Sequence, residues 1–229
     1  MASLLNTSLE QAQAALLAPA ELETGHLASL LHQLPAGADH YADLYFQHAE
    51  QEVWALEKGV VKDASYSLER GVGARVVAGD KTGFAYSKAN PADALGQAAR
   101  AARSIARAGQ QGRVQAFASP DVARLYAPDS PLDVIDRAEK VELLKRIDVA
   151  TRALDPRIKQ VTVSLAGVWE HILVAASDGS LGADVRPLVR FNVSVIVEQN
   201  GRRERGGHGG GGRTGYRYCL QEDRARGYA

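Results

Sequence analysis

The first 38 residues have apolar side chains three and four positions apart, which is the spacing of one face of a helix. The clearest set is Leu27, Leu30, Leu31 and Leu34. This pattern predicts two short helices. We expect Thr7 or Ser8 to cap the first helix, and Pro35 to end the second.

After residue 39 the apolar period becomes two, as in strands. Leu44, Phe46 and His48 alternate with more polar neighbours. Three glycine signals divide the stretch up to residue 87 into an antiparallel meander: Gly59, the pair Gly71 and Gly73, and Gly79-Asp80. A second strand region follows residue 157, with Val161, Val163 and Leu165 predicted on one face. We predict turns there at Asp178-Gly179 and Asn200-Gly201.

Two helical stretches separate these strand regions. Asn90-Pro91 predicts a helix that ends at Gly109, and Ser130-Pro131 predicts a long helix that ends at Asp155-Pro156. The proline-containing stretch between them is typical of a linker. This order of elements predicts an α+β fold, in which α-helices are layered on an antiparallel β-sheet.

Composition narrows the functional classes. The 229 residues carry 27 basic and 27 acidic side chains, so no overall charge attracts the chain to nucleic acid or to anionic membranes. A single cysteine, Cys219, excludes an internal disulfide. The N-terminus lacks the basic start of a signal peptide, and no apolar run approaches the roughly 20 residues of a membrane span. We expect a cytoplasmic protein whose partners include neither nucleic acid nor a membrane.

The segment GRRERGGHGGGGRTGY, residues 201–216, is the most unusual part of the chain. From Gly207 it differs by one residue from a phosphate-binding loop, since Arg213 stands in place of lysine. Such a loop follows a buried strand and opens a helix, whereas this one follows charged residues. The residues after it, YRYCLQ, predict a strand. The phosphate interpretation therefore lacks its structural context.

Three other interpretations of the segment remain open. One Arg-Gly-Gly triplet near Tyr216 and Tyr218 resembles a binding segment for single-stranded nucleic acid, without the usual tandem repeats. Four successive glycines beside a sheet edge suit capture of an extended peptide by strand addition. A mobile hairpin loop explains the same spacing equally well.

No catalytic or metal-ligating residue is predicted from the sequence. The histidines are scattered singly, and no two of them have the helical spacing of a zinc site: His26, His32, His40, His48, His171 and His208. Cys219 has no cysteine companion. A structural or solvent-exposed role is the expectation for each histidine.

Three stretches resemble the N-terminal part of the TldD/PmbA metallopeptidase family, whose genes were once named modulators of DNA gyrase. They are DLYFQ at 43–47, ERGVGARVVAGDKTGFAYS at 69–87, and LVAASDGSLGADVRPLVRFNVSVIVEQNGRRERGGHGGGGRTGY at 173–216. The run DGSLGADVRPLVR and the glycine segment are typical of the TldD branch rather than the PmbA (TldE) branch.

The resemblance implies a cytosolic zinc peptidase that cleaves unfolded or flexible peptides, such as precursor peptides and antitoxins. It also implies a heterodimer with a TldE/PmbA-type subunit. The family's zinc motif, H-E-x-x-x-H, belongs to a second domain and does not occur in residues 1–229. We therefore expect an N-terminal domain without its catalytic domain, which binds no cofactor and is inactive in isolation.

Within this domain we expect a helical lead at 1–38, then a first sheet segment and helix at 39–109. A linker at 110–130, a long helix and second sheet segment at 131–219, and a truncated helix start at 220–229 complete it. The resemblance suggests that the glycine segment binds substrate. The candidate residues are Gly209, Gly210, Gly211 and Gly212, which would pair with the peptide backbone, and Arg213, Arg205 and Arg190, which would hold its carboxylates or carbonyls. The alternatives are a catalytically inactive interaction module and, more remotely, nucleic-acid binding through the Arg/Gly segment.

Overall fold

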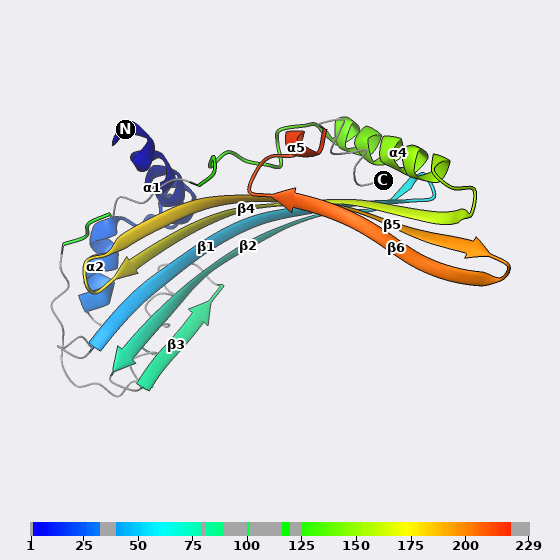
Figure 1. Cartoon of the computed structure of the whole chain (residues 1–229). Coiled ribbons are helices and arrows are strands. Elements are labelled where there is room, and N and C mark those ends of the chain that lie inside the picture. Colours follow the sequence, from blue (N-terminus) through cyan, green and yellow to red (C-terminus); the bar gives the residue numbers. More distant parts are fainter. Residues whose placement is uncertain are drawn as a thin grey trace. The chain divides into compact units, whose positions relative to one another are not determined.

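The computed structural model describes residues 2–32, 40–78, 81–88, 100, 116–119 and 125–220. Its strands form a six-stranded antiparallel sheet in the order β3-β2-β1-β4-β5-β6, accompanied by helices (Figure 1). The predicted α+β class is confirmed. The strands are β1 (His40–Glu57), β2 (Val60–Ala78), β3 (Lys81–Ser87), β4 (Ile158–Ala176), β5 (Leu181–Gln199) and β6 (Arg202–Gly212). The helices are α1 (Ala2–Leu16), the 3-10 helix η1 (Ala18–Ala20), α2 (Thr24–His32), α4 (Arg137–Ala153) and α5 (Arg217–Leu220).

The chain divides into two compact units, each built from three separate stretches. Unit 1 comprises Met1–Ala49, Glu69–Arg124 and Glu170–Val185. Unit 2 comprises Glu50–Leu68, Leu125–Trp169 and Arg186–Ala229. The strands β1, β2, β4 and β5 are long enough to contribute to both units, whereas β3 belongs to unit 1 and β6 to unit 2.

The core of unit 1 lies between α1, α2 and the strands. Leu44 and Phe46 of β1 are buried with Leu27 and Leu31 of α2, as their predicted periodicity requires. Burying each such side chain contributes about 1.5–3 kcal/mol. The predicted positions Leu34 and Pro35 lie outside the described residues.

The core of unit 2 lies between α4 and the strands. Val161, Val163 and Leu165 are fully buried, which confirms their predicted face. They pack in one cluster with Leu144 and Ile147 of α4. This cluster fixes α4 on the face of the sheet that these side chains share.

Two predicted helix starts are wrong. Helix α4 begins at Arg137 rather than after Ser130, because Asp136 and Glu139 form a reciprocal capping box. The Ser130 hydroxyl instead donates to Asp133. Helix α1 begins at Ala2, before Thr7 and Ser8. The predicted helix at 90–109 lies outside the described residues, apart from residue 100.

The prediction that Gly71 and Gly73 interrupt a strand is also wrong, because β2 runs through both. The rings of Tyr86 and Phe84 from β3 lie over these glycines: a Cβ at Gly71 would stand 2.0 Å from the Tyr86 hydroxyl, and one at Gly73 would stand 3.2 Å from the Phe84 ring. The glycines make room for aromatic side chains within a continuous strand.

The predicted turns at Asp178-Gly179 and Asn200-Gly201 are confirmed. Gly179 has a φ of 89°, and the turn at Asn200 and Gly201 has φ values of 52° and 79°. Two successive residues with positive φ are typical of the type I′ turn that joins hairpin strands. The predicted turn at Gly79-Asp80 lies outside the described residues. No described helix has the length and apolar character needed to cross a membrane.

Candidate functional site: the glycine-rich edge strand

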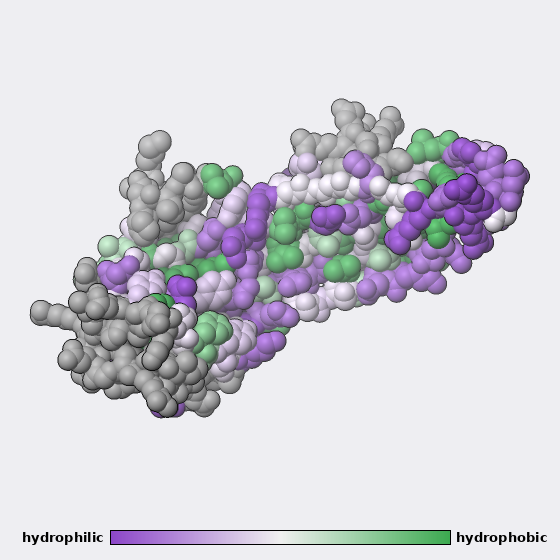
Figure 2. All heavy atoms as spheres, turned by 60° about the horizontal axis from the view of Figure 1, so that its bottom comes forward, coloured by the Kyte–Doolittle hydropathy of each residue, from purple (hydrophilic) through white to green (hydrophobic). Residues whose placement is uncertain are grey.

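The glycine run at 206–212 lies in a strand rather than in the predicted loop. This strand is β6, which pairs antiparallel with β5 from Gln199↔Arg202 to Val189↔Gly212. Because β6 is the last strand in the sheet order, one of its two edges faces no other strand of the described chain. Figure 2 shows a pale band of near-neutral hydropathy along this strand, next to hydrophilic residues at the end of the hairpin.

The residues that follow β6 form a turn and a short helix, so the strand predicted from YRYCLQ is wrong. The Thr214 amide donates to the Gly212 carbonyl across 2.9 Å, and α5 begins at Arg217. The buried side chains of Tyr216 and Cys219 belong to the core of unit 2. Since the glycine amides lie in a strand ladder, they do not curl into a phosphate-binding loop.

Packing against β5 requires glycine at alternate positions of β6. A Cβ would approach a carbonyl oxygen of β5 to well below contact distance at three of them. The distances are 2.8 Å from Gly207 to Val193, 2.5 Å from Gly209 to Phe191, and 2.0 Å from Gly211 to Val189. The close approach of the two backbones therefore accounts for these three glycines.

Other glycines of β6 have no such constraint. A Cβ at Gly206 would stand 3.7 Å from the nearest atom, in the Val195 side chain, and one at Gly212 would stand 3.9 Å from the Thr214 side chain. Both are ordinary contacts. Among the residues that the structure describes, no close contact accounts for the absence of a side chain at these two positions.

The three candidate arginines do not converge on one point. Arg190 lies opposite Gly211, and Arg205 lies opposite Ile196. Because Arg190 and Ile196 are six residues apart on one strand, the two arginines share a face at a separation of about 20 Å. The Arg190 guanidinium donates to Asn192 across 3.1 Å. Arg213 instead lies over the ring of Tyr126, with its guanidinium carbon 5.7 Å from the ring centroid.

Charged side chains are confined to one half of β6. Arg202 pairs with Glu204, and Arg203 pairs with Glu198 of β5, each at 2.7 Å. Charges on an edge strand discourage the addition of a further strand. The other half, residues 206–212, has His208 among six glycines and no Asp, Glu, Lys or Arg. Within the described residues, no Asp, Glu, Lys or Arg of β6 therefore opposes strand addition along these seven residues, about 23 Å.

A buried polar cluster, which the sequence did not indicate, lies in unit 2. Lys140 of α4 is 4% exposed, pairs with Glu52 at 2.5 Å and donates to the Leu132 carbonyl at 2.7 Å. Its ammonium also lies 5.1 Å from the ring centroid of Tyr216 and 5.9 Å from that of Trp54. Burial, followed by the negative charge of Glu52, raises the pKa of the Tyr216 hydroxyl well above its usual range. Lys140 lies on the buried side of α4, next to Leu144 in the helical repeat, which is the one sequence signal for it.

Unit 1 contains a buried histidine pair that the sequence placed as isolated residues. His48 and His171 are 5% and 3% exposed, and their ring centroids lie 5.7 Å apart. The Arg70 side chain donates to His48 Nδ1 across 3.1 Å. The two histidines fall at alternate, apolar-face positions of β1 and β4, which explains their burial.

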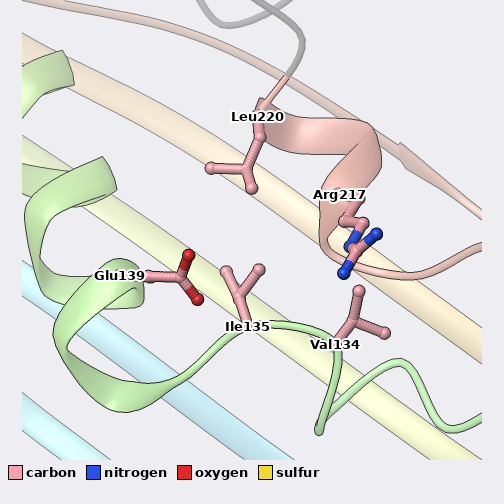
Figure 3. A pocket seen from close by; sticks show the side chains of 5 residues that line it. All are labelled: Val134, Ile135, Glu139, Arg217 and Leu220. Carbon is pink, nitrogen blue, oxygen red and sulfur yellow. The ribbon is translucent and has the colours of Figure 1, made fainter.

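A pocket of about 370 Å³ lies beside α5. Figure 3 shows that Arg217 and Leu220 reach it from α5, Glu139 from the first turn of α4, and Val134 and Ile135 from the segment before α4. Its lining is apolar with one acidic and one basic side chain.

No metal centre is formed within the part of the chain that the structure describes. No three His, Cys, Asp or Glu side chains there come together as a metal site. The zinc implied by the resemblance therefore has no ligand set among these residues.

Comparisons with known proteins decide the family. Two models of protein-family domains match the sequence. The model described as "PmbA/TldA metallopeptidase domain 1" matches residues 42–106, and the one described as "PmbA/TldA metallopeptidase central domain" matches residues 130–229. The chain belongs to the TldD/PmbA metallopeptidase family. The resemblance drawn from the sequence is thereby confirmed.

Relatives of known sequence agree. The chain is 43% identical over 215 residues to a "Metalloprotease TldD homolog" of Haemophilus influenzae, covering 93% of this chain and 45% of that protein. It is 40% identical over 183 residues to a homologue of the same name from Buchnera aphidicola subsp. Schizaphis graminum, covering 80% and 38%. The chain thus spans less than half the length of the relatives it matches.

Solved structures share the fold. A putative modulator of DNA gyrase from Thermotoga maritima matches with a TM-score of 0.63 at 15% identity, covering 83% of this chain and 42% of that one. TldE from Thermococcus kodakarensis matches with a TM-score of 0.64 at 13% identity, covering 83% and 43%. At these identities the likeness supports the architecture alone.

The two matched family domains do not coincide with the two compact units. Domain 1 contains residues 50–68, which belong to unit 2, and the central domain contains residues 170–185, which belong to unit 1. The family domains follow the sequence, whereas the units follow contacts along the long strands. The segment boundaries predicted from the sequence stay predictions.

Proposed function

We propose that this chain is the substrate-enclosing and partner-contacting part of a TldD-type zinc metallopeptidase that cleaves unfolded or flexible peptides. The proposal rests on one observation: β6 is an edge strand whose glycine half carries no charged side chain to block strand addition. Membership of a metallopeptidase family supports the peptide as ligand. The zinc, the TldE/PmbA-type partner and the cytosolic location belong to the proposal, and the zinc ligands lie in a part of the whole protein outside these residues.

In this proposal, an extended peptide pairs with the outer edge of β6 along residues 206–212. Backbone N–H and C=O groups are the same in every residue, so pairing of this kind tolerates any sequence. Each backbone hydrogen bond contributes about 0.5–1.5 kcal/mol to the binding free energy. Because only alternate residues of β6 direct their backbone groups to the outer edge, seven residues form few such bonds and give a moderate affinity. Arg190 and Arg205 lie about 20 Å apart on one face, a separation that suits acidic side chains near the two ends of such a peptide.

Peptides with N-methylated backbones test this proposal. An extended peptide of about ten residues directs alternate N–H groups to opposite sides, so methylation of one set removes the donors that face β6 and leaves the other set intact. We expect one methylated series to bind this chain at least about tenfold more weakly than the parent peptide in fluorescence anisotropy, a loss of about 1.4 kcal/mol. The series methylated on the opposite set is the matched control and retains the parent affinity.

Equal affinities of the two methylated series would overturn strand addition. In the whole protein with its partner subunit, we expect the same methylated series to resist cleavage. A metal chelator should abolish cleavage of the parent peptide without changing its affinity for the 229-residue chain. Loss of both binding and cleavage on chelation would contradict the separation of the two roles.

A further inference from the structure

The glycine half of β6, residues 206–212, has few side chains that could fix the strand by packing against its neighbours. Six of the eleven residues of β6 are glycine. Glycine loses more backbone freedom on folding than any other residue, and it offers no side chain to pack. The hairpin turn and the ion pairs hold the first half of β6. The second half pairs with β5 through its backbone as far as Gly212, and six of its seven residues have no side chain to pack.

Tyr216 occupies a closed socket four residues after Gly212. Its side chain is fully buried, and its hydroxyl fills the space above Gly167: a Cβ at Gly167 would stand 2.2 Å from the hydroxyl oxygen. The ammonium of Lys140, which Glu52 holds in place, lies 5.1 Å from the ring centroid. We call Gly167, Leu132, Lys140 and Glu52 the Tyr216 socket.

Only three residues, 213–215, connect the end of β6 to Tyr216, and backbone hydrogen bonds and close packing hold them. The Thr214 amide bonds to the Gly212 carbonyl, and the Cys219 amide bonds to the Tyr216 carbonyl, both at 2.9 Å. Gly215, between these bonds, sits so close to Val134 that a Cβ would stand 3.0 Å from its side chain. A displacement of Tyr216 would therefore move the backbone at the end of β6.

We propose that Tyr216 is a positioning residue, which fixes the glycine half of β6 in register with β5 so that its outer edge can pair with a peptide. This inference rests on the proposed function for its purpose. Its structural step, the anchoring of β6, is measurable without any peptide.

The experiment is amide hydrogen exchange on the 229-residue chain in the absence of peptide. We expect Tyr216→Ala to speed exchange across residues 206–212 by about tenfold or more, because the strand end is released. Amides in the β2–β3 pairing of unit 1 should exchange at the wild-type rate. Tyr216→Phe should speed exchange much less than Tyr216→Ala, because it keeps the ring in the socket and removes only the hydroxyl above Gly167.

Gly167→Ala tests the same idea with the tyrosine intact, and it serves where Tyr216→Ala does not fold. The added methyl group displaces the ring, so exchange across residues 206–212 should again rise. Adding Tyr216→Phe to Gly167→Ala should restore part of the protection, since the overlapping hydroxyl is removed. Unchanged exchange in Gly167→Ala, or a rise spread evenly over unit 2, would overturn the anchoring step.

Peptide affinity separates positioning from simple stabilisation. If wild type binds the peptide, Tyr216→Ala should bind about tenfold more weakly, and Tyr216→Phe should lose much less affinity. Faster exchange in β6 with unchanged peptide affinity would refute the positioning role. If wild-type protein binds no peptide while the exchange results hold, the proposed function fails and the anchor stands.

Discussion

The two classes of glycine in β6 predict opposite responses to the same substitution. Gly211→Ala places a methyl carbon 2.0 Å from the Val189 carbonyl oxygen and 3.0 Å from the Arg190 Cα, both backbone atoms. Neither atom can move without distorting the β5–β6 ladder. Gly206→Ala places the methyl carbon 3.7 Å from a Val195 methyl group, which is an ordinary contact.

The magnitudes follow from these distances. Gly206→Ala reduces the freedom of the unfolded chain without strain, so we expect the free energy of unfolding to rise by about 0.4–1 kcal/mol. Gly211→Ala reduces the freedom of the unfolded chain equally, but it also forces backbone atoms of β5 and β6 apart. This overpacking lowers the free energy of unfolding by about 1–3 kcal/mol, and by more where a hydrogen bond between the strands breaks. The two variants should therefore differ by about 1–3 kcal/mol, with Gly206→Ala the more stable.

Urea unfolding followed by tryptophan fluorescence measures this difference. The chain has two tryptophans, Trp54 and Trp169, and both belong to unit 2, which contains β6. A shift of the midpoint at constant slope reports a change in stability. Equal stabilities of the two variants, or the reverse order, would refute the argument that close approach to β5 decides which glycines are required.

Three other predictions concern the core and the hairpin of unit 2. Lys140→Ala removes the ion-pair partner of the Glu52 carboxylate, whose side chain is only 12% exposed, so the free energy of unfolding should fall by about 3–5 kcal/mol. Replacing both residues together should lower it by less than Lys140→Ala alone, because no buried charge is then left without its partner. A urea titration of both variants checks this order. Burial raises the pKa of the Cys219 thiol from 9.0 to about 11, so the thiol ionises earlier in the unfolded chain than in the folded one. Stability should be full below pH 9 and should fall as pH rises from 9 to 11, by up to about 1.4 kcal/mol per pH unit for this group, and Cys219→Ala should show a shallower fall. Gly201→Val, at a φ of 79°, should destabilise the β5–β6 hairpin by about 1–2 kcal/mol. Arg202→Val, which removes one exposed ion pair with Glu204, should cost less, about 0–1 kcal/mol, and thermal unfolding distinguishes the two variants.

The periodic parts of the chain were predictable because local spacing and burial agree there. The faces of Leu44 and Phe46, and of Val161, Val163 and Leu165, follow from alternation alone. The turns at Asp178-Gly179 and Asn200-Gly201 follow from side chains that tolerate positive φ. These signals need no knowledge of distant parts of the sequence.

The errors arose where a distant contact overrides the local signal. Gly71 and Gly73 resembled strand breaks, but they make room for Tyr86 and Phe84 of the neighbouring strand. The glycine run of β6 resembled a loop for a similar reason, because the carbonyl groups of β5 that require glycine are not marked in the sequence. The resemblance to a peptidase family indicated this segment as a candidate for substrate binding, which stays a proposal. The structure shows residues 202–212 as an edge strand rather than a loop.

The buried cluster of Lys140, Glu52 and Tyr216 could not be predicted from the sequence, for a different reason. Its members lie on α4, on β1 and after β6, and charged residues are expected at the surface unless a partner is known. A lysine at a buried position of the helical repeat is a weak signal, since long side chains often reach solvent from such positions.

Amide hydrogen exchange of the 229-residue chain, with and without an extended peptide, tests the central claim most directly. If β6 receives the peptide by strand addition, amides within residues 206–212 should gain protection on binding, while amides in the charged half of β6 and in the β2–β3 pairing exchange as before. Binding that leaves the amides of residues 206–212 unprotected, or that protects another strand instead, would contradict the account.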